Sequence, residues 1–470
     1  MKIVYIHYHL KTGGVTTVLR QQVEAIGDTC DTLVLTGVPS ESSFPGKTVF
    51  IPGLGYDGPD QVDSNPEDVA SSIIQAVKLK WNNGCDIVHV HNPTLAKNKN
   101  FLKTLKALQN KNITLFLQIH DFAEDGRPAH YFSHEDYISD CHYGVINSRD
   151  YNILLKAGLK KEGLHKIPNA IKPFPSSLTS TKLKDYVLYP IRAIRRKNIG
   201  EAILLSLFFR NNETLVITLP PNSPKDIESY EGWKAFVKEK NLSVVFDAGL
   251  TKEFSELVLS SRFMITTSIT EGFGFSYLEP WTAKKNLWGR KLPDICDDFE
   301  KNGIQLTHLY TKLNVPVEWI GKDKLFSAWQ ASLRKACAKF NMAIDGPTIS
   351  KAFGKITKND VIDFGLLNET FQKTIISHIL AGQVQQNQLV ILNSFLSYPG
   401  YVSNLEELIQ NNMDAVLHNY NKTIYQKRLL DVYAKVVKYP VFQKIEKDVL
   451  PVHFIIPETF SLLKWGDYAE

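Results

Sequence analysis

The stretch ITTSITEGFGFSYLEPW (265–281) decides the fold, because it joins an apolar strand to a helix through a glycine turn. The apolar runs VVFDAGL (244–250) and FMITTS (263–268) predict parallel strands, and FSYLEPWTA predicts the start of a helix. The glycines of the EGFG turn allow the backbone to approach a ligand closely. The helix start offers N–H groups and a positive dipole end, which suit a phosphate. This stretch therefore predicts an anion site at the carboxyl edge of a parallel sheet.

Two glutamates, Glu271 and Glu279, flank this predicted anion site with seven residues between them. Because a phosphate repels carboxylates, we expect each glutamate to accept hydrogen bonds from hydroxyls, one on either side of the phosphate. A sugar nucleotide has this layout, with sugar hydroxyls, a pyrophosphate and ribose hydroxyls in succession. The alternative is a helix-terminal acid and an unrelated surface acid, since acidic residues favour the first turn of a helix.

The bulk composition limits the class of protein. A chain of 470 residues predicts two domains, and its 43% hydrophobic and 22% charged content is ordinary for a globular protein. A net charge of +5 is too small to indicate nucleic-acid binding. Five scattered cysteines without a CxxC pair indicate reduced thiols and a cytoplasmic location. The N-terminal stretch lacks the features of a signal peptide, and no apolar run is long enough to predict a membrane span.

The order of predicted elements indicates two α/β domains of the doubly wound, Rossmann-like type. Strands and helices alternate through 1–175, and a Pro-, Ser- and Thr-rich stretch at 172–185 predicts a linker. Alternation resumes in 185–415, of which about 300–400 is atypical and mostly helical. We expect 416–470 to form closing helices that pack back toward the N-terminal domain. Since ligands bind at the carboxyl ends of parallel strands, two facing domains would enclose a cleft.

A basic loop follows the first strand of the second domain, in YPIRAIRRKNIGEAI (189–203). Arg192 and Lys197 lie five residues apart across this strand–helix loop. A fork-shaped guanidinium and a compact ammonium together suit a pyrophosphate. The alternative is a solvated basic loop without a ligand.

The first domain offers weaker candidates. Gly13 and Gly14 lie between its first strand and first helix, but KTGGVTT matches neither the GxGxxG nor the P-loop pattern. They form either a tight turn or a backbone wall beside a ligand. His120 ends a strand and is expected either to point into the cleft or to be satisfied by the backbone. His89 and His91 share a strand face, but no third ligand is evident, so we expect no metal.

Taken together, these motifs resemble the retaining GT-B glycosyltransferases called group 1, or family 4. The resemblance covers about 1–295 and 418–436. It rests on the glycine loop, DIVHVHNP, IHDF, VINSRDYNILLKAG with HKIPNAI, IRAIRRKN, the E-x7-E segment and KNLWGRKLPDI. The sequence departs from the family pattern at Ile191, where glycine is frequent, and at Asp294, where glutamate is usual. The segment 300–400 has no counterpart that can be placed.

The resemblance implies a retaining, metal-independent transfer from a nucleotide-sugar. Arg192 and Lys197 would neutralise the charge that grows on the β-phosphate. Glu271 would bind hydroxyls of the donor sugar, Glu279 the ribose, and His120 the sugar or the reacting oxygens. The residues implied to bind the donor are Gly13, Gly14, Gly249, Leu250, Gly272, Phe273, Gly274, Phe275 and Glu279.

The sequence does not identify the base and sugar of the donor, or the acceptor. UDP-, GDP- and ADP-sugars are all compatible, and no cofactor, metal or nucleic acid is expected. Arg127 and His130 in EDGRPAHYF (124–132) suggest a small anionic acceptor. Basic stretches such as KLK (78–80) could meet a membrane surface, but they resemble ordinary helix faces. A GT-B epimerase, a sugar phosphorylase and a non-catalytic sugar-nucleotide binder are the alternatives, and the oligomeric state is not predicted.

Overall fold

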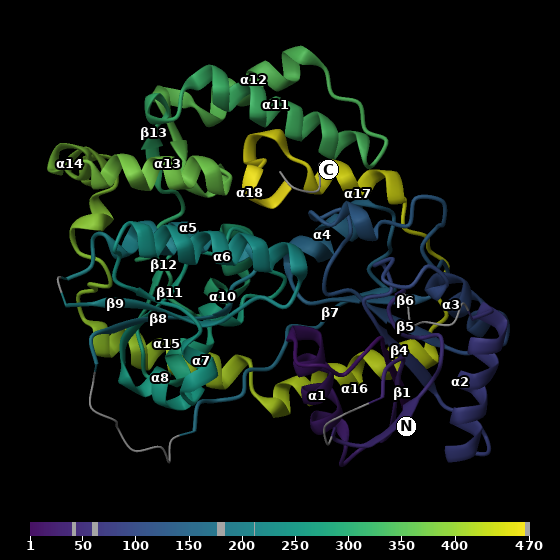
Figure 1. Cartoon of the computed structure of the whole chain (residues 1–470). Helices are drawn as coiled ribbons and strands as arrows, with labels where there is room; N and C mark the ends of the chain where they lie inside the picture. Colours follow the sequence, from purple (N-terminus) through teal and green to yellow (C-terminus); the bar gives the residue numbers. More distant parts are fainter. Residues whose placement is uncertain (40–43, 59–63, 176–183, 211, 466–470) are drawn as a thin grey trace. The chain divides into compact units, whose positions relative to one another are not determined.

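The computed structural model describes residues 1–39, 44–58, 64–175, 184–210 and 212–465, and the chain divides into two compact units (Figure 1). Unit 1 comprises Met1–Ala170 and Tyr420–Phe454. Unit 2 comprises Ile171–Asn419 and Ile455–Glu470. Most of the linker expected at 172–185 lies outside the described residues. Each unit has its own parallel sheet, and each is considered by itself.

Unit 1 is built on a parallel sheet that has seven strands within its described residues, in the order β3-β2-β1-β4-β5-β6-β7. The strands are β1 (Lys2–His7), β2 (Asp31–Thr36), β3 (Lys47–Phe50), β4 (Ile87–His91), β5 (Leu115–Gln118), β6 (His142–Val145) and β7 (Leu164–Lys166). The order reverses beside β1, so the loops after β1 and β4 leave the sheet at a topological switch point, where doubly wound folds bind ligands.

Helices cover both faces of this sheet. They are α1 (Gly14–Ile26), α2 (Pro66–Lys80), α3 (Phe101–Asn110), α4 (Ser148–Lys156), α16 (Lys422–Lys438) and α17 (Leu450–Phe454), with the 3₁₀ turns η1 (Pro128–His130) and η8 (Lys447–Val449). Successive side chains of a strand point to opposite faces. Val4 accordingly packs in one buried cluster with residues of α2 and α3, and Tyr5 packs in the other with residues of α1 and α16.

The closing helix α16 is part of the core of unit 1, and Figure 1 shows it beside α1. The hydroxyl of Tyr433 lies 2.8 Å from that of Tyr5 and 2.8 Å from Nδ1 of His89. Leu429 is fully buried in the same cluster. We expected all of 416–470 to pack on the N-terminal domain, whereas Ile455–Glu470 belongs to unit 2. The physical reason is the packing of apolar side chains, since the ring centre of Phe460 in this segment lies 6.1 Å from the ring centre of Trp329 in unit 2.

Unit 2 contains a second parallel sheet, with five strands among its described residues in the order β10-β9-β8-β11-β12. The strands are β8 (Tyr186–Arg192), β9 (Thr214–Leu219), β10 (Val244–Val245), β11 (Ser261–Thr266) and β12 (Leu287–Gly289). The connecting elements are η2 (Arg195–Lys197), α5 (Ile199–Ser206), α6 (Pro224–Glu239), α7 (Ala248–Thr251), α8 (Phe254–Ser260), η3 (Phe275–Tyr277), α9 (Glu279–Thr282) and α10 (Pro293–Glu300). The predicted fold class, two Rossmann-like α/β units, is confirmed.

The atypical segment after 300 is mostly helical, as predicted, but it also contains a two-stranded antiparallel ribbon of β13 (Asn314–Pro316) and β14 (Val361–Asp363). Its helices are α11 (Lys322–Ala338), α12 (Gly346–Ile356), α13 (Glu369–Leu380), α14 (Gln383–Leu392) and α15 (Leu405–Asn419), and the chain returns at α18 (Leu462–Trp465). Short 3₁₀ turns connect them: η4 (Val317–Trp319), η5 (Lys358–Asp360), η6 (Phe364–Leu366), η7 (Ser394–Ser397) and η9 (Pro457–Thr459).

Two elements near the predicted anion site differ from expectation. VVFDAGL forms only the two-residue β10, because Asp247 adopts a left-handed φ of 61° and the chain turns into α7. FSYLEPWTA forms η3 and the four-residue α9, separated at Leu278 by a φ of −119°, instead of one helix. Such short turns sum few peptide dipoles. An anion bound here would therefore depend on individual N–H groups and on charged side chains.

Within the part of the chain that the structure describes, no helix combines the length and the apolar character that crossing a membrane requires.

The packing of α16 predicts the effect of truncating its buried face. Leu429→Ala should lower the free energy of unfolding by about 2–5 kcal/mol, because it removes a fully buried side chain and leaves a cavity. Val437→Ala on the same helix is the control, since Val437 is 52% exposed and its truncation should cost less than about 0.5 kcal/mol. Urea denaturation of the full chain followed by circular dichroism measures both. Equal effects would contradict the packing of α16 in the core.

Candidate functional site

In unit 2 the chain folds so that the basic loop after β8 contacts the segment after β11. The hydroxyl of Tyr189 donates to the carbonyl oxygen of Lys197 at 2.6 Å, and the Thr267 hydroxyl donates to the same oxygen at 3.0 Å. The N–H of Ile269 donates to the carbonyl oxygen of Arg196 at 3.0 Å. These bonds join the Arg-x4-Lys loop to the residues that precede Glu271. The two motifs, distant in sequence, therefore share one edge of the sheet.

Lys197 and Glu271 form an ion pair in which Nζ donates to Oε1. Both side chains are largely buried, with exposed fractions of 16% and 8%. Burial alone would raise the pKa of Glu271, but the positive charges of Lys197 and Arg196 outweigh it and lower that pKa. The carboxylate is therefore ionised at neutral pH and holds Lys197 at the head of the loop.

Arg192 lies at the end of β8, and its Nη1 donates to the carbonyl oxygen of Pro220 at 2.9 Å. Gly249, in α7, approaches the end of the neighbouring strand β9, since a Cβ on it would lie 3.0 Å from the carbonyl oxygen of Thr218. Leu250 next to it is 65% exposed. The carboxyl ends of β8 and β9 thus bring together Arg192 and two of the predicted donor-binding residues.

The EGFG turn is tightly built. Gly274 has a left-handed φ of 90°, and a Cβ there would lie 2.9 Å from the ring of Tyr277, so glycine is required. The Phe273 ring is buried, 5.1 Å from the Phe275 ring and 5.6 Å from the Phe299 ring. Among the predicted donor contacts, Phe273 can therefore offer a ligand only its backbone.

Glu279 is the first residue of α9 and is exposed. The protein atoms around its carboxyl group nevertheless raise its pKa by desolvation, and the positive charge of Lys197 opposes this rise only in part. The positive charge of Lys197 thus acts to lower the pKa of both glutamates, and its ammonium group donates a hydrogen bond to Glu271. The environments of the two carboxyl groups differ, since the pKa of Glu271 is lowered and that of Glu279 is raised.

A buried cluster of charged side chains lies next to the basic loop that carries Lys197, and the sequence analysis did not predict it. The Arg290 guanidinium donates to both carboxylate oxygens of Glu201, at 2.8 and 2.6 Å, and to both of Asp363, at 2.8 and 2.7 Å. The Tyr310 hydroxyl donates to Glu201 at 2.7 Å. The side chains of Arg290, Glu201 and Asp363 are 4%, 0% and 11% exposed. A bidentate geometry on both sides satisfies charges that would be costly to bury alone.

This centre is connected to the basic loop through Asn198, which follows Lys197 and adopts a left-handed φ of 52°. The Asn198 amide donates to Glu201 at 2.8 Å, and the Gln372 amide donates to Asn198 at 2.9 Å. Asp363 and Gln372 both come from the segment without a family counterpart. That segment therefore helps to hold the backbone of the loop that carries Lys197.

In unit 1, His120 is buried at the end of β5, and its main-chain N–H donates to the side chain of Asn92 at 2.7 Å. Its Nε2 lies 2.8 Å from Nδ1 of His91. Burial lowers the pKa of His120 to about 4, so the ring is uncharged at neutral pH. It can hydrogen-bond to a hydroxyl, but it does not supply positive charge.

Gly13 and Gly14 begin α1, and neither backbone requires glycine. Gly13 has an extended φ of 178°, and no atom lies within 4 Å of a Cβ built on Gly14. A tight turn that only glycine can make is therefore not the reason for these residues, and the space beside them is open.

The histidines of β4 form hydrogen bonds within unit 1. Both ring nitrogens of His89 have protein partners, the Tyr433 hydroxyl at 2.8 Å and the Gln118 side chain at 2.9 Å. In the described ranges no group of three or more His, Cys, Asp or Glu is arranged to hold a metal ion.

Arg127 and His130 lie in the segment after β5. Arg127 pairs with Asp121, with 2.8 Å between Nη1 and Oδ1. Nε2 of His130 lies 2.5 Å from Nζ of Lys97, a residue that the sequence analysis did not select. The two predicted acceptor residues therefore lie next to further charged side chains, Asp121 beside Arg127 and Lys97 beside His130.

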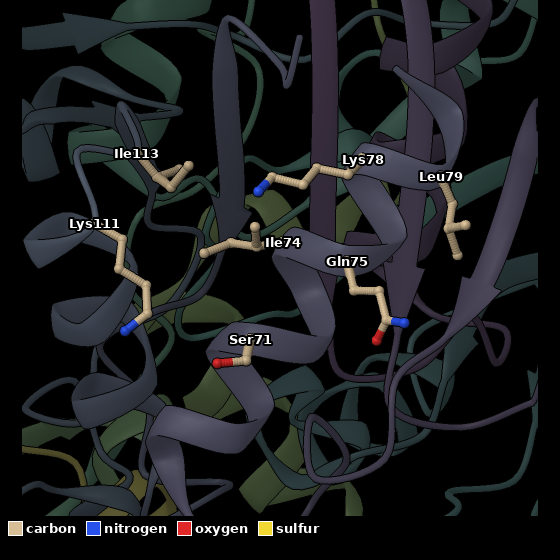
Figure 2. Close-up of a pocket in the computed structure, with 7 residues that line it drawn as sticks. All are labelled: Ser71, Ile74, Gln75, Lys78, Leu79, Lys111 and Ile113. Carbon is tan, nitrogen blue, oxygen red and sulfur yellow. The ribbon is translucent and has the colours of Figure 1, made fainter. Parts of the chain in front are cut away.

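A separate surface hollow of about 650 Å³ lies against α2 (Figure 2). It is lined by Ser71, Ile74, Gln75, Lys78, Leu79, Lys111 and Ile113. Because Ile113 precedes β5, this hollow lies at the amino ends of the strands, away from the carboxyl edge. It includes none of the predicted site residues, and we assign it no function.

Comparison with known proteins finds one similar sequence and several similar folds. No protein-family model matches the chain. The mannosylglucosyl-3-phosphoglycerate synthase of Petrotoga mobilis is 30% identical, in an alignment that covers 79% of this chain and 80% of the relative. Sucrose-phosphate synthase from Thermosynechococcus elongatus matches with a TM-score of 0.53 and 13% identity, over 92% of this chain and 98% of that one. Anabaena HepE in complex with UDP-glucose matches with a TM-score of 0.54 and 12% identity, over 92% and 99%. At such low identities the two structures show the fold alone.

The Arg290 centre predicts a large difference between the loss of a buried and of an exposed cation. Arg290→Met leaves two buried carboxylates without their cation, so it should destabilise the protein by about 3–5 kcal/mol. Lys322→Met is the control, because Lys322 and its partner Asp360 are 55% and 81% exposed and such pairs contribute about 0–1 kcal/mol. Thermal and urea unfolding of the full chain measure both. A loss below about 1 kcal/mol for Arg290→Met would contradict the role given to this centre.

Proposed function

The chain belongs to the GT-B glycosyltransferases of the group 1 type, and we propose that it transfers a hexosyl group from a nucleotide-sugar to a small anionic acceptor, with retention of anomeric configuration and without a metal ion. The Petrotoga relative supports the reaction class, and the UDP-glucose bound to HepE supports a nucleotide-sugar donor. The finer parts of the proposal rest on the residues of each unit.

The contact between Lys197 and Glu271 is the observation that carries the proposal. It joins the basic loop after β8 to the E-x7-E segment after β11, at the edge where α/β sheets bind ligands. In the proposed donor complex Lys197 donates hydrogen bonds to the diphosphate, and Glu271 accepts hydrogen bonds from the hydroxyls of the sugar. The ion pair therefore places side by side two groups that are proposed to act on neighbouring parts of one substrate.

Leaving-group stabilisation is the proposed chemical role of the cations. As the bond between the anomeric carbon and the β-phosphate oxygen breaks, negative charge grows on the phosphate. Arg192 and Lys197 stabilise that charge, with N–H groups of Gly272–Phe275 as further donors. Two fixed cations can supply the charge that a divalent ion provides in other transferases. This is the physical basis for proposing a metal-independent reaction.

The other donor contacts follow the order of the substrate's parts. Glu279 binds the ribose hydroxyls, and Gly249 with Leu250 lies beside the nucleoside. Gly13 and Gly14 leave open space at the start of α1 for the donor or the acceptor. His120, as a neutral imidazole, hydrogen-bonds to the sugar or to a reacting oxygen. The base is open among uracil, guanine and adenine.

The acceptor is proposed to be small and anionic. The Petrotoga relative is named for a product that contains 3-phosphoglycerate, which is a phosphorylated acid. Arg127 and His130 are the proposed contacts, since guanidinium groups bind phosphate and carboxylate through paired hydrogen bonds. An acceptor with a phosphoglycerate group therefore fits both the relative and the local charge.

Removal of one charged group from the donor site should slow transfer strongly. Lys197→Ala, Arg192→Ala and Glu271→Ala should each reduce kcat by about 10²-fold or more, the magnitude typical of a lost charge-stabilising group. Lys184→Ala is the control, since its side chain is 42% exposed and pairs with exposed Glu256. Product formation from radiolabelled nucleotide-sugars measures all four. Turnover near that of the unmodified enzyme in Lys197→Ala would rule out the proposed clamp.

Metal independence and retention are tested together. Transfer should continue in excess EDTA, and proton NMR of the first product should show the anomeric configuration of the donor. Activity that EDTA abolishes and Mg²⁺ restores would refute metal independence. An inverted anomer would refute retention, whereas release of a free sugar epimer without acceptor would favour an epimerase.

A further inference from the structure

Three loops of unit 1 meet at the carboxyl edge of its sheet. Tyr56 lies between β3 and α2, Lys97 lies between β4 and α3, and His130 lies between β5 and β6. The N–H of Asp57 donates to the carbonyl oxygen of Lys97 at 2.7 Å, and the N–H of Ala96 donates to that of His130 at 2.8 Å. Backbone bonds on both sides of Lys97 therefore fix its position relative to the other two loops.

A buried amide reinforces this arrangement. The side chain of Asn98, next to Lys97, donates to the carbonyl oxygens of Gly53 and Gly55, each at 2.7 Å. Asn98 itself is 4% exposed. The loop that carries Lys97 is thus held against the loop that carries Tyr56 by a satisfied buried group, which is a preformed arrangement.

The side chains that these loops present are cationic or aromatic. Nζ of Lys97 lies 2.5 Å from Nε2 of His130 and 5.3 Å from the centre of the Tyr56 ring. The His9 ring packs edge-on against the same Tyr56 ring at 5.0 Å. None of the carboxylates in the described ranges forms an ion pair with Lys97, and the nearby Asp121 pairs with Arg127.

Partial burial disfavours the charged form of Lys97. Burial and then the charge of Arg127 lower the pKa of Lys97 to about 8. Burial, Lys97 and Arg127 lower the pKa of His130 to about 4. A partly buried cation is stabilised by a nearby anion, because desolvation disfavours its charged form. Asp121 opposes the fall of the pKa of Lys97 but forms its ion pair with Arg127. An anion bound beside Lys97 would stabilise its charge directly.

We propose that Lys97, Arg127 and His130 form the binding site for a phosphate monoester, and that Lys97 determines the preference for this charged group. That the phosphate belongs to the acceptor rests on the proposed transferase function. Lys97 has three N–H donors, of which one points to His130 and two are available to phosphate oxygens. The Arg127 guanidinium has the planar fork that matches a phosphate.

His130 and Tyr56 have positioning roles in this site. Nε2 of His130 accepts from the ammonium group of Lys97, which places the ring proton on Nδ1. The Tyr56 ring faces the ammonium group and stabilises its charge through a cation–π contact. Both contacts direct Lys97 without neutralising it, so its charge remains for the ligand.

The test separates this site from the donor clamp, which also binds phosphate. Inorganic phosphate and 3-phosphoglycerate are titrated by calorimetry into the full-length Lys197→Ala protein, in which the clamp is disabled. Both ligands should bind. Adding Lys97→Met should weaken binding at least about tenfold, the effect of losing a charged hydrogen bond, and Lys97→Arg should restore most of it. Lys106→Met, which removes an exposed lysine of α3 that bonds to Gln109, should change nothing.

The outcomes are distinguishable from failure of the proposed function. Unchanged phosphate binding in Lys97→Met, or no binding of either ligand in the Lys197→Ala background, would overturn this site. If the site binds phosphate but the unmodified protein binds no nucleotide-sugar, the site stands and the transferase proposal falls. Circular dichroism of each variant confirms that the fold is retained, and Lys97→Arg keeps the test decisive if Lys97→Met unfolds.

Discussion

The Arg290 guanidinium between the carboxylates of Glu201 and Asp363 is the constraint on which the second unit depends. All three groups are almost fully buried, so removal of Arg290 leaves two carboxylates without their cation, and removal of either carboxylate leaves N–H donors of the guanidinium without an acceptor. Satisfying them requires the end of β12, the start of α5 and the end of β14 to meet at one point. Because Asn198 bonds to Glu201 and follows Lys197 directly, this requirement also fixes the loop that carries Lys197. The helical segment after 300 is thereby coupled to the chemistry of the basic loop without contributing a predicted substrate contact.

The ion pair between Lys197 and Glu271 joins the two motifs of the proposed donor site. A lysine in a largely buried position would be costly without a counter-charge, and Glu271 supplies one. In the proposed donor complex Lys197 moves to the phosphate and Glu271 accepts hydrogen bonds from hydroxyl groups. The bonds of Tyr189 and Thr267 to the carbonyl oxygen of Lys197 fix the backbone of the loop, and a fixed arrangement of donors is what electrostatic stabilisation of a transition state requires.

The sequence was sufficient for those features that depend on local periodicity and on the geometry of parallel sheets. Strand–helix alternation predicted both sheets, and two motifs that each follow a strand predicted that Lys197 and Glu271 lie at one edge. The sequence did not predict the Arg290 centre, because its members are far apart in the chain and meet only when β13 and β14 pair. Three-residue strands carry too little alternation to be detected. Lys97 was missed for the same reason, since its environment arises from three separate loops. Gly13 and Gly14 were selected from their residue type, yet their backbones do not require glycine.

A crystal structure of the protein with an intact nucleotide-sugar tests the central claim most directly. The account predicts that the diphosphate contacts Lys197 and Arg192, that the ion pair between Lys197 and Glu271 is broken, and that Glu271 accepts hydrogen bonds from sugar hydroxyls. A nucleotide-sugar bound elsewhere, or one bound beside an unchanged Lys197–Glu271 pair, would contradict it.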